Sequence, residues 1–337
     1  MKLLRFLTFA ICVHFWLPGV TAQEASPVQQ PSPAQQPVAT AAAPQKQKTF
    51  AEQLPNTVGF LKVTYNDGPN LMAILGTCFF VYLEDKRLGD NMGFVYLVTN
   101  RHMAEPGIEK GLKYPVAQVI LRMNLRSPQN GIESSEGAIP MGSTVRWFFP
   151  ADESTDLAVM QINPDVIKYD YQTIPASLFA TEKDVASSAV EPGDPVVFAG
   201  YFYQFPGQTR IEPIVRQGVL AMMPSEKINT TLQKPGQLYL ADAHAFHGNS
   251  GSPLFVNLGG SRHGVLSLAE RYLLIGVVSG YYPEGESFSV PAATVLTGEV
   301  HDNSGIATVV PAEELLQLLN SNELQADRDA KVAASKR

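Results

Sequence analysis

Cysteine is almost absent from this chain of 337 residues, and one of its two cysteines, Cys12, lies in an apolar stretch near the amino terminus. If that stretch is removed on export, Cys78 remains alone and no internal disulfide can form. Stability without disulfides suits a bacterial envelope protein with a large core better than a small domain held together by bridges. We expect Cys78 to be a buried free thiol in a strand rather than a redox group.

Basic residues and long apolar runs are also scarce. Lysine and arginine number 25 against 32 acidic residues, which gives a formal net charge of −7, and the basic residues form no stripe. This balance argues against nucleic acid or an anionic membrane as a partner. After residue 22 no segment is long and apolar enough to cross a bilayer, so no membrane span is expected once a signal is removed.

Histidines and cysteines do not show the spacing of metal ligands. Asp242, His244 and His247 lie close together in sequence, but a structural loop is the preferred interpretation. His263 and His301 stand apart from other ligand types. The sequence therefore predicts no metal and no other cofactor.

The amino terminus has the features of a secretory signal peptide over residues 1–22. A short basic start is followed by an apolar run from Phe6 to Leu17 and by small residues that end at Ala22. An uncleaved membrane anchor stays open as the alternative, although the run is shorter than the roughly 20 residues that a span requires. Residues 23–50 form a Gln/Pro/Ala-rich linker that lacks the apolar anchors needed to fold. We expect an exported bacterial protein, periplasmic or secreted.

Most of the remaining chain has the pattern of an all-β protein, with short apolar or alternating runs separated by turn residues. A Pro/Gly boundary near residue 190 divides these runs into two groups. We predict two antiparallel six-stranded barrels packed against each other, with the candidate site in the cleft between them. The runs are 59–65, 71–83, 94–98, 117–123, 144–149 and 156–162 in the first half, and 195–201, 215–222, 236–241, 252–256, 272–279 and 306–310 in the second.

The predicted domain covers residues 51–322, with the first barrel at about 56–165 and the second at about 190–310. A helix is expected at 311–320, because a proline starts it and leucines follow at core spacing. Residues 323–337 are rich in charge, and we expect a solvated tail there.

The segment 242–253 carries the strongest chemical signal. Its centre, residues 248–251, reads Gly-Asn-Ser-Gly, and the glycines permit a tight backbone that leaves a serine hydroxyl free. The N–H groups of Gly248 and Ser250 would then be able to stabilise a developing oxyanion. Taken alone, the segment could equally be an ordinary turn between strands.

Two upstream segments supply the partners that a serine nucleophile needs. His102 follows the apolar run 96–99, and Asp156 stands at the start of another run, 157–162. A hydroxyl nucleophile needs a base to accept its proton, and the base needs an acid to fix its tautomer. The chain offers His102, Asp156 and Ser250 in that order, so only tertiary folding can bring them together.

With these motifs the chain resembles the trypsin-like serine proteases, and within them the Do-like, or high-temperature-requirement, branch. The similarity extends over about residues 56–320. The matching motifs are Thr99-Asn100-Arg101-His102-Met103, Asp156-Leu157-Ala158-Val159, the loop 242–253, and segments 192–200, 217–220, 275–280 and 304–311.

The chain departs from the family pattern at a few places. Met103 and Ser252 stand where the family usually carries Val and Gly, and the segments 103–145 and 163–190 are longer. The peptide-binding module often appended in this branch is not expected, because only a short stretch follows residue 320.

The resemblance implies a serine endopeptidase that acts on protein or peptide substrates. It assigns the nucleophile to Ser250, the general base to His102 and the orienting carboxylate to Asp156. It also implies an oxyanion hole formed by the N–H groups of Gly248 and Ser250. A catalytically latent protein on the same fold that binds or holds unfolded chains, and an esterase, remain the alternatives. Assembly into a homo-oligomer is left open.

Substrate specificity depends on the resemblance alone. The substrate backbone is expected to pair with Ser279-Gly280-Tyr281, while Gly280 and Gly305 would wall the side-chain pocket and His244 would lie near its floor. An imidazole between glycine walls suits an apolar or an acidic group, and the absence of Asp there argues against a demand for Lys or Arg. A loop histidine without substrate contact is the preferred alternative for His244.

Overall fold

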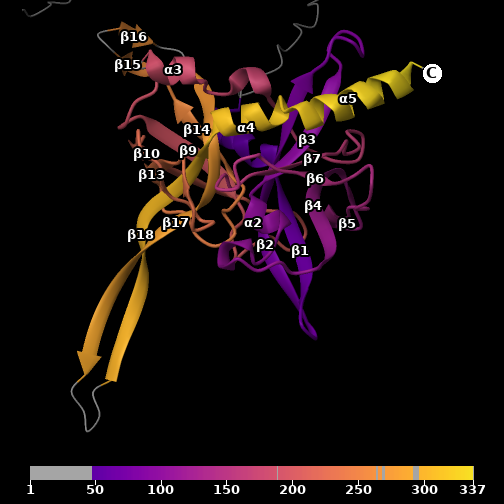
Figure 1. Ribbon diagram of the computed structural model, residues 1–337. Helices are drawn as coiled ribbons and strands as arrows, with labels where there is room; N and C mark the ends of the chain where they lie inside the picture. The colour runs from indigo at the N-terminus through magenta and orange to yellow at the C-terminus, as the bar shows by residue number, and fades with distance from the viewer. Residues whose placement is uncertain (1–47, 188, 263–264, 268–269, 291–295, 337) are drawn as a thin grey trace, which may run out of the picture. The chain divides into compact units, whose positions relative to one another are not determined.

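Two β assemblies make up most of the part of the chain that the structure describes (Figure 1). The structure is a computed structural model, and it describes residues 48–187, 189–262, 265–267, 270–290 and 296–336. The predicted signal peptide and nearly all of the predicted linker lie outside the described residues. Among the described helices, none is long and apolar enough to span a membrane.

The first assembly is an eight-stranded sheet in the order β5-β4-β1-β2-β3-β7-β6, with β8 paired to β2. Its central strands are rich in aromatic and β-branched residues, which favour strands and fill a core. The turn that joins the first two strands uses Gly68 with φ +58° before Pro69, as a type II′ hairpin requires. The strands are β1 (Val58–Asp67), β2 (Asn70–Glu84), β3 (Gly93–Thr99), β4 (Val116–Gln129), β5 (Ile132–Ala138), β6 (Trp147–Phe148), β7 (Ala158–Gln161) and β8 (Ile174–Pro175).

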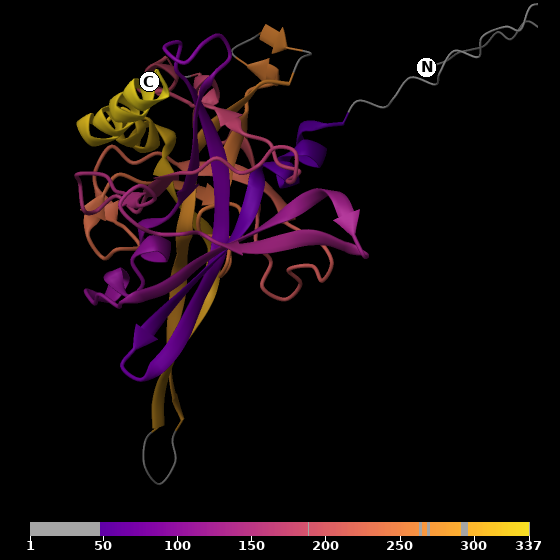
Figure 2. The ribbon, with the colours of Figure 1, turned by 90° about the vertical axis from the view of Figure 1, so that its right-hand side faces the viewer.

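This sheet differs from the predicted six-stranded first barrel. The run 144–149 shrinks to the two residues of β6, and β5 and β8 were not predicted. The sequence of β5 is Ile-Glu-Ser-Ser-Glu-Gly-Ala, which has little strand propensity, and most of it is exposed. Its pairing with β4 comes from an Asn130-Gly131 turn with φ values of 52° and 79°, a type I′ signal that the sequence does contain. In Figure 2 the magenta β4–β5 hairpin stands out beside the indigo strands β1 and β2.

The second assembly is a closed barrel in the order β10-β13-β18-β17-β14-β9, which confirms the predicted six-stranded second barrel. Two short pairs, β11 with β12 and β15 with β16, lie outside it. The barrel strands are β9 (Pro195–Gly200), β10 (Ile214–Met222), β13 (Tyr239–Asp242), β14 (Pro253–Asn257), β17 (Tyr272–Val290) and β18 (Leu296–Pro311). The short strands are β11 (Ile228–Asn229), β12 (Pro235–Gly236), β15 (Gly260–Arg262) and β16 (Val265–Ser267).

Strands β17 and β18 are much longer than the predicted runs 272–279 and 306–310. Their register continues from Gly276 opposite Pro311 to Val290 opposite Leu296. Figure 1 shows the paired ends running away from the barrel. The barrel part of the pair is apolar and was therefore predictable. In the extension, aromatic and β-branched residues are separated by Pro283, Gly285, Gly298 and polar residues, so no continuous apolar run marks it.

Five helices and three 3₁₀ turns accompany the strands in the described part of the chain. Thr49 and Glu52 form a capping box that starts the first helix. Phe50, the last residue of the predicted linker, stacks on Tyr272 with ring centroids 3.8 Å apart, so the folded domain begins before residue 51. The helices are α1 (Phe50–Gln53), α2 (Arg101–Ala104), α3 (Glu182–Ala186), α4 (Ala312–Leu319) and α5 (Asn322–Ser335), with 3₁₀ turns η1 (Leu54–Thr57), η2 (Ile108–Lys110) and η3 (Ala176–Leu178).

The prediction of a solvated tail at 323–337 was wrong, because this segment forms α5. Ser321 caps the helix, and Leu324, Arg328 and Val332 are buried at spacings that put them on one face. The buried face could not be predicted from an apolar pattern, because one of its three buried residues is an arginine. Figure 1 shows α5 beside β3 and β7, and Lys331 of α5 contacts Gln161 at the end of β7.

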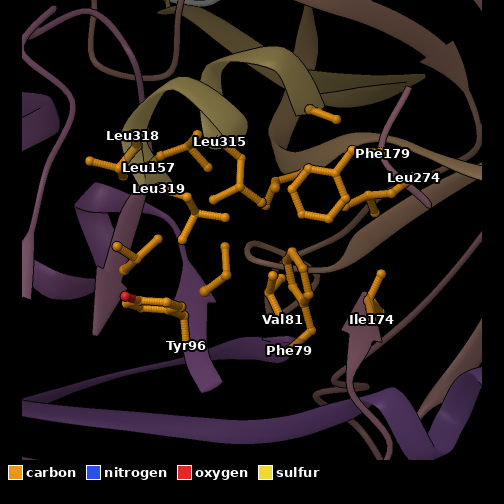
Figure 3. Packing of buried hydrophobic residues seen from close by; sticks show 14 of the residues in the cluster. Phe79, Val81, Tyr96, Leu157, Ile174, Phe179, Leu274, Leu315, Leu318 and Leu319 are labelled. Carbon is orange, nitrogen blue, oxygen red and sulfur yellow. The ribbon is translucent and has the colours of Figure 1, made fainter. Parts of the chain in front are cut away.

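One apolar cluster joins the two halves. Figure 3 shows the leucines of α4 turned toward Tyr96 of β3 and Leu157, the residue before β7, and toward Phe179 and Leu274. Each half also has its own core, and that of the first contains Cys78, which is fully buried as a free thiol, as predicted. Burial raises the pKa of the Cys78 thiol well above its usual range.

Candidate active site

His102 and Asp156 meet at the end of the first sheet. β3 ends at Thr99 and α2 follows at once, so His102 lies in the first turn after the strand. The ring Nδ1 lies 2.8 Å from Asp156 Oδ2, and the backbone N–H of His102 donates to Asp156 Oδ1 at 3.0 Å. Both carboxylate oxygens of Asp156 therefore bind the same residue. The side chain of Asn100 donates to the Asp156 carbonyl at 2.8 Å and holds the following segment in place.

The pair has the electrostatics of a base and its orienting acid. Asp156 is fully buried and His102 is only 8% exposed. Burial alone would lower the pKa of His102, but the charge of Asp156 and the hydrogen bond to it outweigh burial, and Glu109 adds to them, so the pKa of His102 is raised. Because a carboxylate accepts at Nδ1, the proton of the neutral ring stays there and Nε2 carries the lone pair.

Ser250 comes from the second assembly, in the loop between β13 and β14. Its hydroxyl donates to the Ser279 carbonyl at 3.4 Å. Within the described residues, no hydrogen bond joins Ser250 to His102. Catalytic hydrogen bonds are often long before substrate binds, so the missing bond does not by itself exclude a role for Ser250.

The backbone before Ser250 leaves two N–H groups free. Asn249 N–H donates to the Phe246 carbonyl at 2.9 Å, which closes a four-residue turn with Gly248 at φ +95° in its third position. A positive φ there is that of a type II turn. The Asn249 side chain braces the turn by accepting from Phe246 N–H and donating to the Tyr201 carbonyl. In the part of the chain that is described, neither Gly248 nor Ser250 uses its N–H in a hydrogen bond.

Gly248 also satisfies a packing requirement. A Cβ at this position would lie 2.6 Å from Tyr201 Cδ1, which is closer than real contacts allow. The sequence predicted no role for Tyr201 or for Thr77, which likewise contacts the site, whereas Asn100 belongs to the His102 motif. No local pattern could have marked the first two, because their partners are distant in sequence.

The residues expected to bind the substrate backbone lie at the rim of the second barrel. Ser279 is buried, and its hydroxyl lies 3.0 Å from Thr308 Oγ1 and 3.1 Å from Thr231 Oγ1. Tyr281 is more exposed and its hydroxyl lies 3.3 Å from His247 Nε2. The register between β17 and β18 shifts on both sides of Gly280 and Tyr281, which themselves stay opposite Thr308 and Ala307 of β18.

The structure brings His244 and Gly305 together. A Cβ at Gly305 would lie 3.0 Å from Cε1 of the His244 ring, and both residues have positive φ. The His244 side chain is 65% exposed, so it lies over Gly305 at the surface and not as a buried floor. Among the described residues, no group of three or more His, Cys, Asp or Glu side chains is arranged to hold a metal ion.

A cavity of about 290 Å³ is lined in part by Arg101, the residue before His102. Its walls include Ile108, Leu112 and Leu232. Two ion pairs border it, Arg101 with Glu105 at 2.7 Å and Lys234 with Glu153 at 2.6 Å. Because Arg101 precedes His102 in the chain and Leu232 comes from the second assembly, both halves line the cavity.

The family model of the trypsin-like peptidase domain matches residues 76–265, more than half of the chain. The chain belongs to this peptidase family. The match spans His102, Asp156 and Ser250, and it agrees with the fold expected from the motifs. Among curated proteins, none matches the chain.

Several solved structures resemble it at low identity. HtrA-type protease AlgW with a decapeptide is 16% identical with a TM-score of 0.45, over 80% of this chain and 65% of that one. AlgW with a tripeptide is 16% identical with a TM-score of 0.44, over 80% and 61%. Deg5 is 17% identical with a TM-score of 0.39, over 68% and 81%. The chain therefore spans less than two thirds of the AlgW chains.

Proposed function

We propose that this protein is a serine endopeptidase that cuts protein or peptide substrates through Ser250, His102 and Asp156. The observation that carries the proposal is the buried hydrogen bond between His102 Nδ1 and Asp156 Oδ2, 2.8 Å long, within a chain of the trypsin-like peptidase family. A buried carboxylate that accepts at Nδ1 leaves Nε2 basic and fixes the ring. That is what a serine nucleophile requires of its base.

The proposed reaction uses groups of this chain only. His102 Nε2 takes the Ser250 proton as Oγ attacks the peptide carbonyl, and the imidazolium then protonates the leaving amine. The negative oxygen is held by the N–H groups of Gly248 and Ser250, which have no other partner in the described residues. Water, activated by His102, then hydrolyses the acyl-enzyme and restores Ser250.

For the substrate, we propose that its backbone pairs with Ser279, Gly280 and Tyr281 and that its side chain lies between Gly280, Gly305 and His244. The strand pairing supports this, because β14 pairs with β17 only as far as Val277, so β17 from Ser279 on has a free edge on that side in the part of the chain that is described. Cleavage of a peptide library should show a preference for apolar or acidic residues before the cut bond. His244→Ala should change that preference if the ring contacts substrate, and an unchanged profile would make it a loop residue only.

The test of the proposed mechanism uses a fluorophosphonate probe and labelled casein. Wild-type protein should be labelled at Ser250 and should digest casein, whereas Ser250→Ala and His102→Ala should each lose at least about a thousandfold in turnover. Ser252→Ala is the matched control. It removes a hydroxyl from the same loop, and that hydroxyl is buried and has no hydrogen-bond partner among the described residues. Labelling without digestion of casein but with hydrolysis of small esters would indicate an esterase. Absence of labelling would indicate a latent binding protein.

We also propose export to the periplasm or the exterior, on the basis of residues 1–22. The mature chain should begin at Gln23 when its amino terminus is determined by mass spectrometry after expression in a bacterium. Recovery of the intact chain in the membrane fraction would instead support an uncleaved anchor.

A further inference from the structure

Thr77 joins the first sheet to the nucleophile loop of the second assembly. It lies in β2 and is fully buried. The Thr77 hydroxyl donates to the Gly248 carbonyl at 2.8 Å, and the Thr77 N–H donates to the Ser250 carbonyl at 2.9 Å. One residue thus binds the backbone on both sides of Asn249.

The remaining polar groups of Thr77 are also used. Tyr201 N–H donates to the Thr77 hydroxyl oxygen at 2.8 Å, and the Thr99 hydroxyl donates to the Thr77 carbonyl at 2.8 Å. The direction of each bond is fixed, because an N–H can only donate and a carbonyl can only accept. The single proton of the Thr77 hydroxyl must therefore point to Gly248.

These contacts connect both sides of the site. Thr99 is the last residue of β3, just before the segment that carries His102. Tyr201 packs against Gly248 and accepts from the Asn249 side chain. Through Thr77, the strand that leads to the base and the loop that carries the nucleophile share one hydrogen-bonded residue.

We propose that Thr77 is a positioning residue, whose hydroxyl sets the Gly248–Ser250 backbone in the orientation that presents its N–H groups to the oxyanion. The proposal rests on the proposed function. Glycine at 248 has wide conformational freedom, so the orientation of its peptide groups depends on what its carbonyl binds. Without the Thr77 hydroxyl, the Gly248 carbonyl and the Tyr201 N–H would each lose a hydrogen-bond partner in a buried setting. Rotation of the loop would give them new partners, but it would turn the Gly248 and Ser250 N–H groups away from the oxyanion.

The variants Thr77→Val and Thr77→Ser test this directly. Valine has nearly the shape of threonine and keeps the backbone N–H but has no hydroxyl, whereas serine keeps the hydroxyl. Thr57→Val is the matched control, since Thr57 is also buried and its hydroxyl donates to the Leu54 carbonyl at 2.8 Å, far from the nucleophile in sequence. Turnover of labelled casein is measured per active site, counted by fluorophosphonate titration.

For Thr77→Val we expect kcat to fall by about 10- to 100-fold with KM within about twofold, because loss of one oxyanion donor alone costs about 100- to 1,000-fold. Thr77→Ser should restore most of kcat, and Thr57→Val should keep it. The acid limb of the pH profile should be unchanged, because the His102–Asp156 pair is intact. Equal kcat per site in Thr77→Val and Thr77→Ser would overturn the proposal.

Crystal structures of the two variants separate this proposal from the proposed function. In Thr77→Val the Gly248 carbonyl should point away from its place in the wild type, and in Thr77→Ser it should stay. A Gly248–Ser250 segment that keeps its orientation in Thr77→Val would refute the positioning role even if the wild type digests nothing. Conversely, a wild type no more active than Ser250→Ala would refute the proposed function. The positioning role of Thr77 would then still be tested by the crystal structures of Thr77→Val and Thr77→Ser.

Discussion

The guanidinium of Arg328 donates to the Tyr96 hydroxyl at 3.1 Å and to the Leu319 carbonyl at 2.8 Å. Arg328 is only 5% exposed, although it lies in a segment whose composition is mostly charged and small. The bond fastens α5 to β3 of the first sheet. Thus α4 follows the last strand of the second barrel, and α5, which comes after it, packs against the first assembly.

Arg328→Met should lower the free energy of unfolding by about 2–3 kcal/mol, because methionine fills the space but leaves a buried hydroxyl and a helix-terminal carbonyl unpaired. Urea unfolding followed by circular dichroism measures this. Asp329→Asn is the control, since Asp329 lies on the same helix as Arg328 and its exposed pair with Arg87 should contribute little. Equal effects of the two substitutions would contradict a specific role for the buried arginine.

The activity of the proposed enzyme should depend on pH through His102. The neutral ring is the base, so kcat/KM should fall as pH drops through the raised pKa of His102, which lies above the usual value near 6.5. Asp156→Asn removes the charge that stabilises the imidazolium, so it should move this acid limb to lower pH. It should also reduce kcat by about 10⁴-fold, the size known for that change in a Ser-His-Asp triad. An acid limb that stays in place would mean that another group titrates.

The same shift has a consequence for stability. A folded pKa above the unfolded one means that His102 adds stability that is fully present below about pH 6.5 and is lost as pH rises through the folded value. The pH dependence of unfolding in Asp156→Asn, compared with the wild type, measures this part.

Gly248→Ala should abolish most turnover while the fold is retained. The added Cβ would be strained at φ +95° and would lie 2.6 Å from Tyr201, so the turn that frees two N–H groups cannot persist. We expect kcat per labelled site to drop about 100- to 1,000-fold. Gly68→Ala provides the control, because its φ is also positive, at +58°, but no atom lies within 4 Å of the added Cβ. Loss of activity in Gly68→Ala would point to general strain instead.

Ser252 and Gly200 should be energetically coupled. A Cβ at Gly200 would lie 2.1 Å from Ser252 Oγ, and that buried hydroxyl has no partner among the described residues. Gly200→Ala should therefore destabilise the protein, and adding Ser252→Gly should recover much of the loss. A double-mutant cycle by urea unfolding gives the coupling, which we expect at about 1 kcal/mol or more. Additive effects would show that Ser252 is not what resists the methyl group, which leaves Thr77 Oγ1 at 3.0 Å and Asn249 Nδ2 at 3.3 Å.

Features that depend on neighbouring residues in the sequence were predicted, and features that depend on contacts between distant residues were not. His102 and Asp156 each stand beside an apolar run, so a local pattern pointed to both, and the structure bonds them. The serine loop had its own glycine signature. In contrast, the sequence around Thr77 is that of an ordinary strand. The hydrogen bonds of its hydroxyl go to Gly248 and Tyr201, which are distant in sequence.

The errors in the fold prediction have the same cause. β5 has weak strand propensity and forms because the Asn130-Gly131 turn folds it onto β4, and that turn was the available signal. α5 is polar overall, and only its contacts with Tyr96 and the core define a buried face. Strands β17 and β18 are long because they pair with each other as far as Val290 and Leu296. No continuous apolar run predicts that length.

The fully enclosed thiol of Cys78 gives this protein a built-in reporter. Since burial keeps it protonated and out of reach, alkylating reagents and mild oxidants should spare the native molecule. Its rate of modification by iodoacetamide would then report how often the first core opens around Cys78. Burial in this way also keeps the Cys78 thiol from forming a disulfide between two molecules.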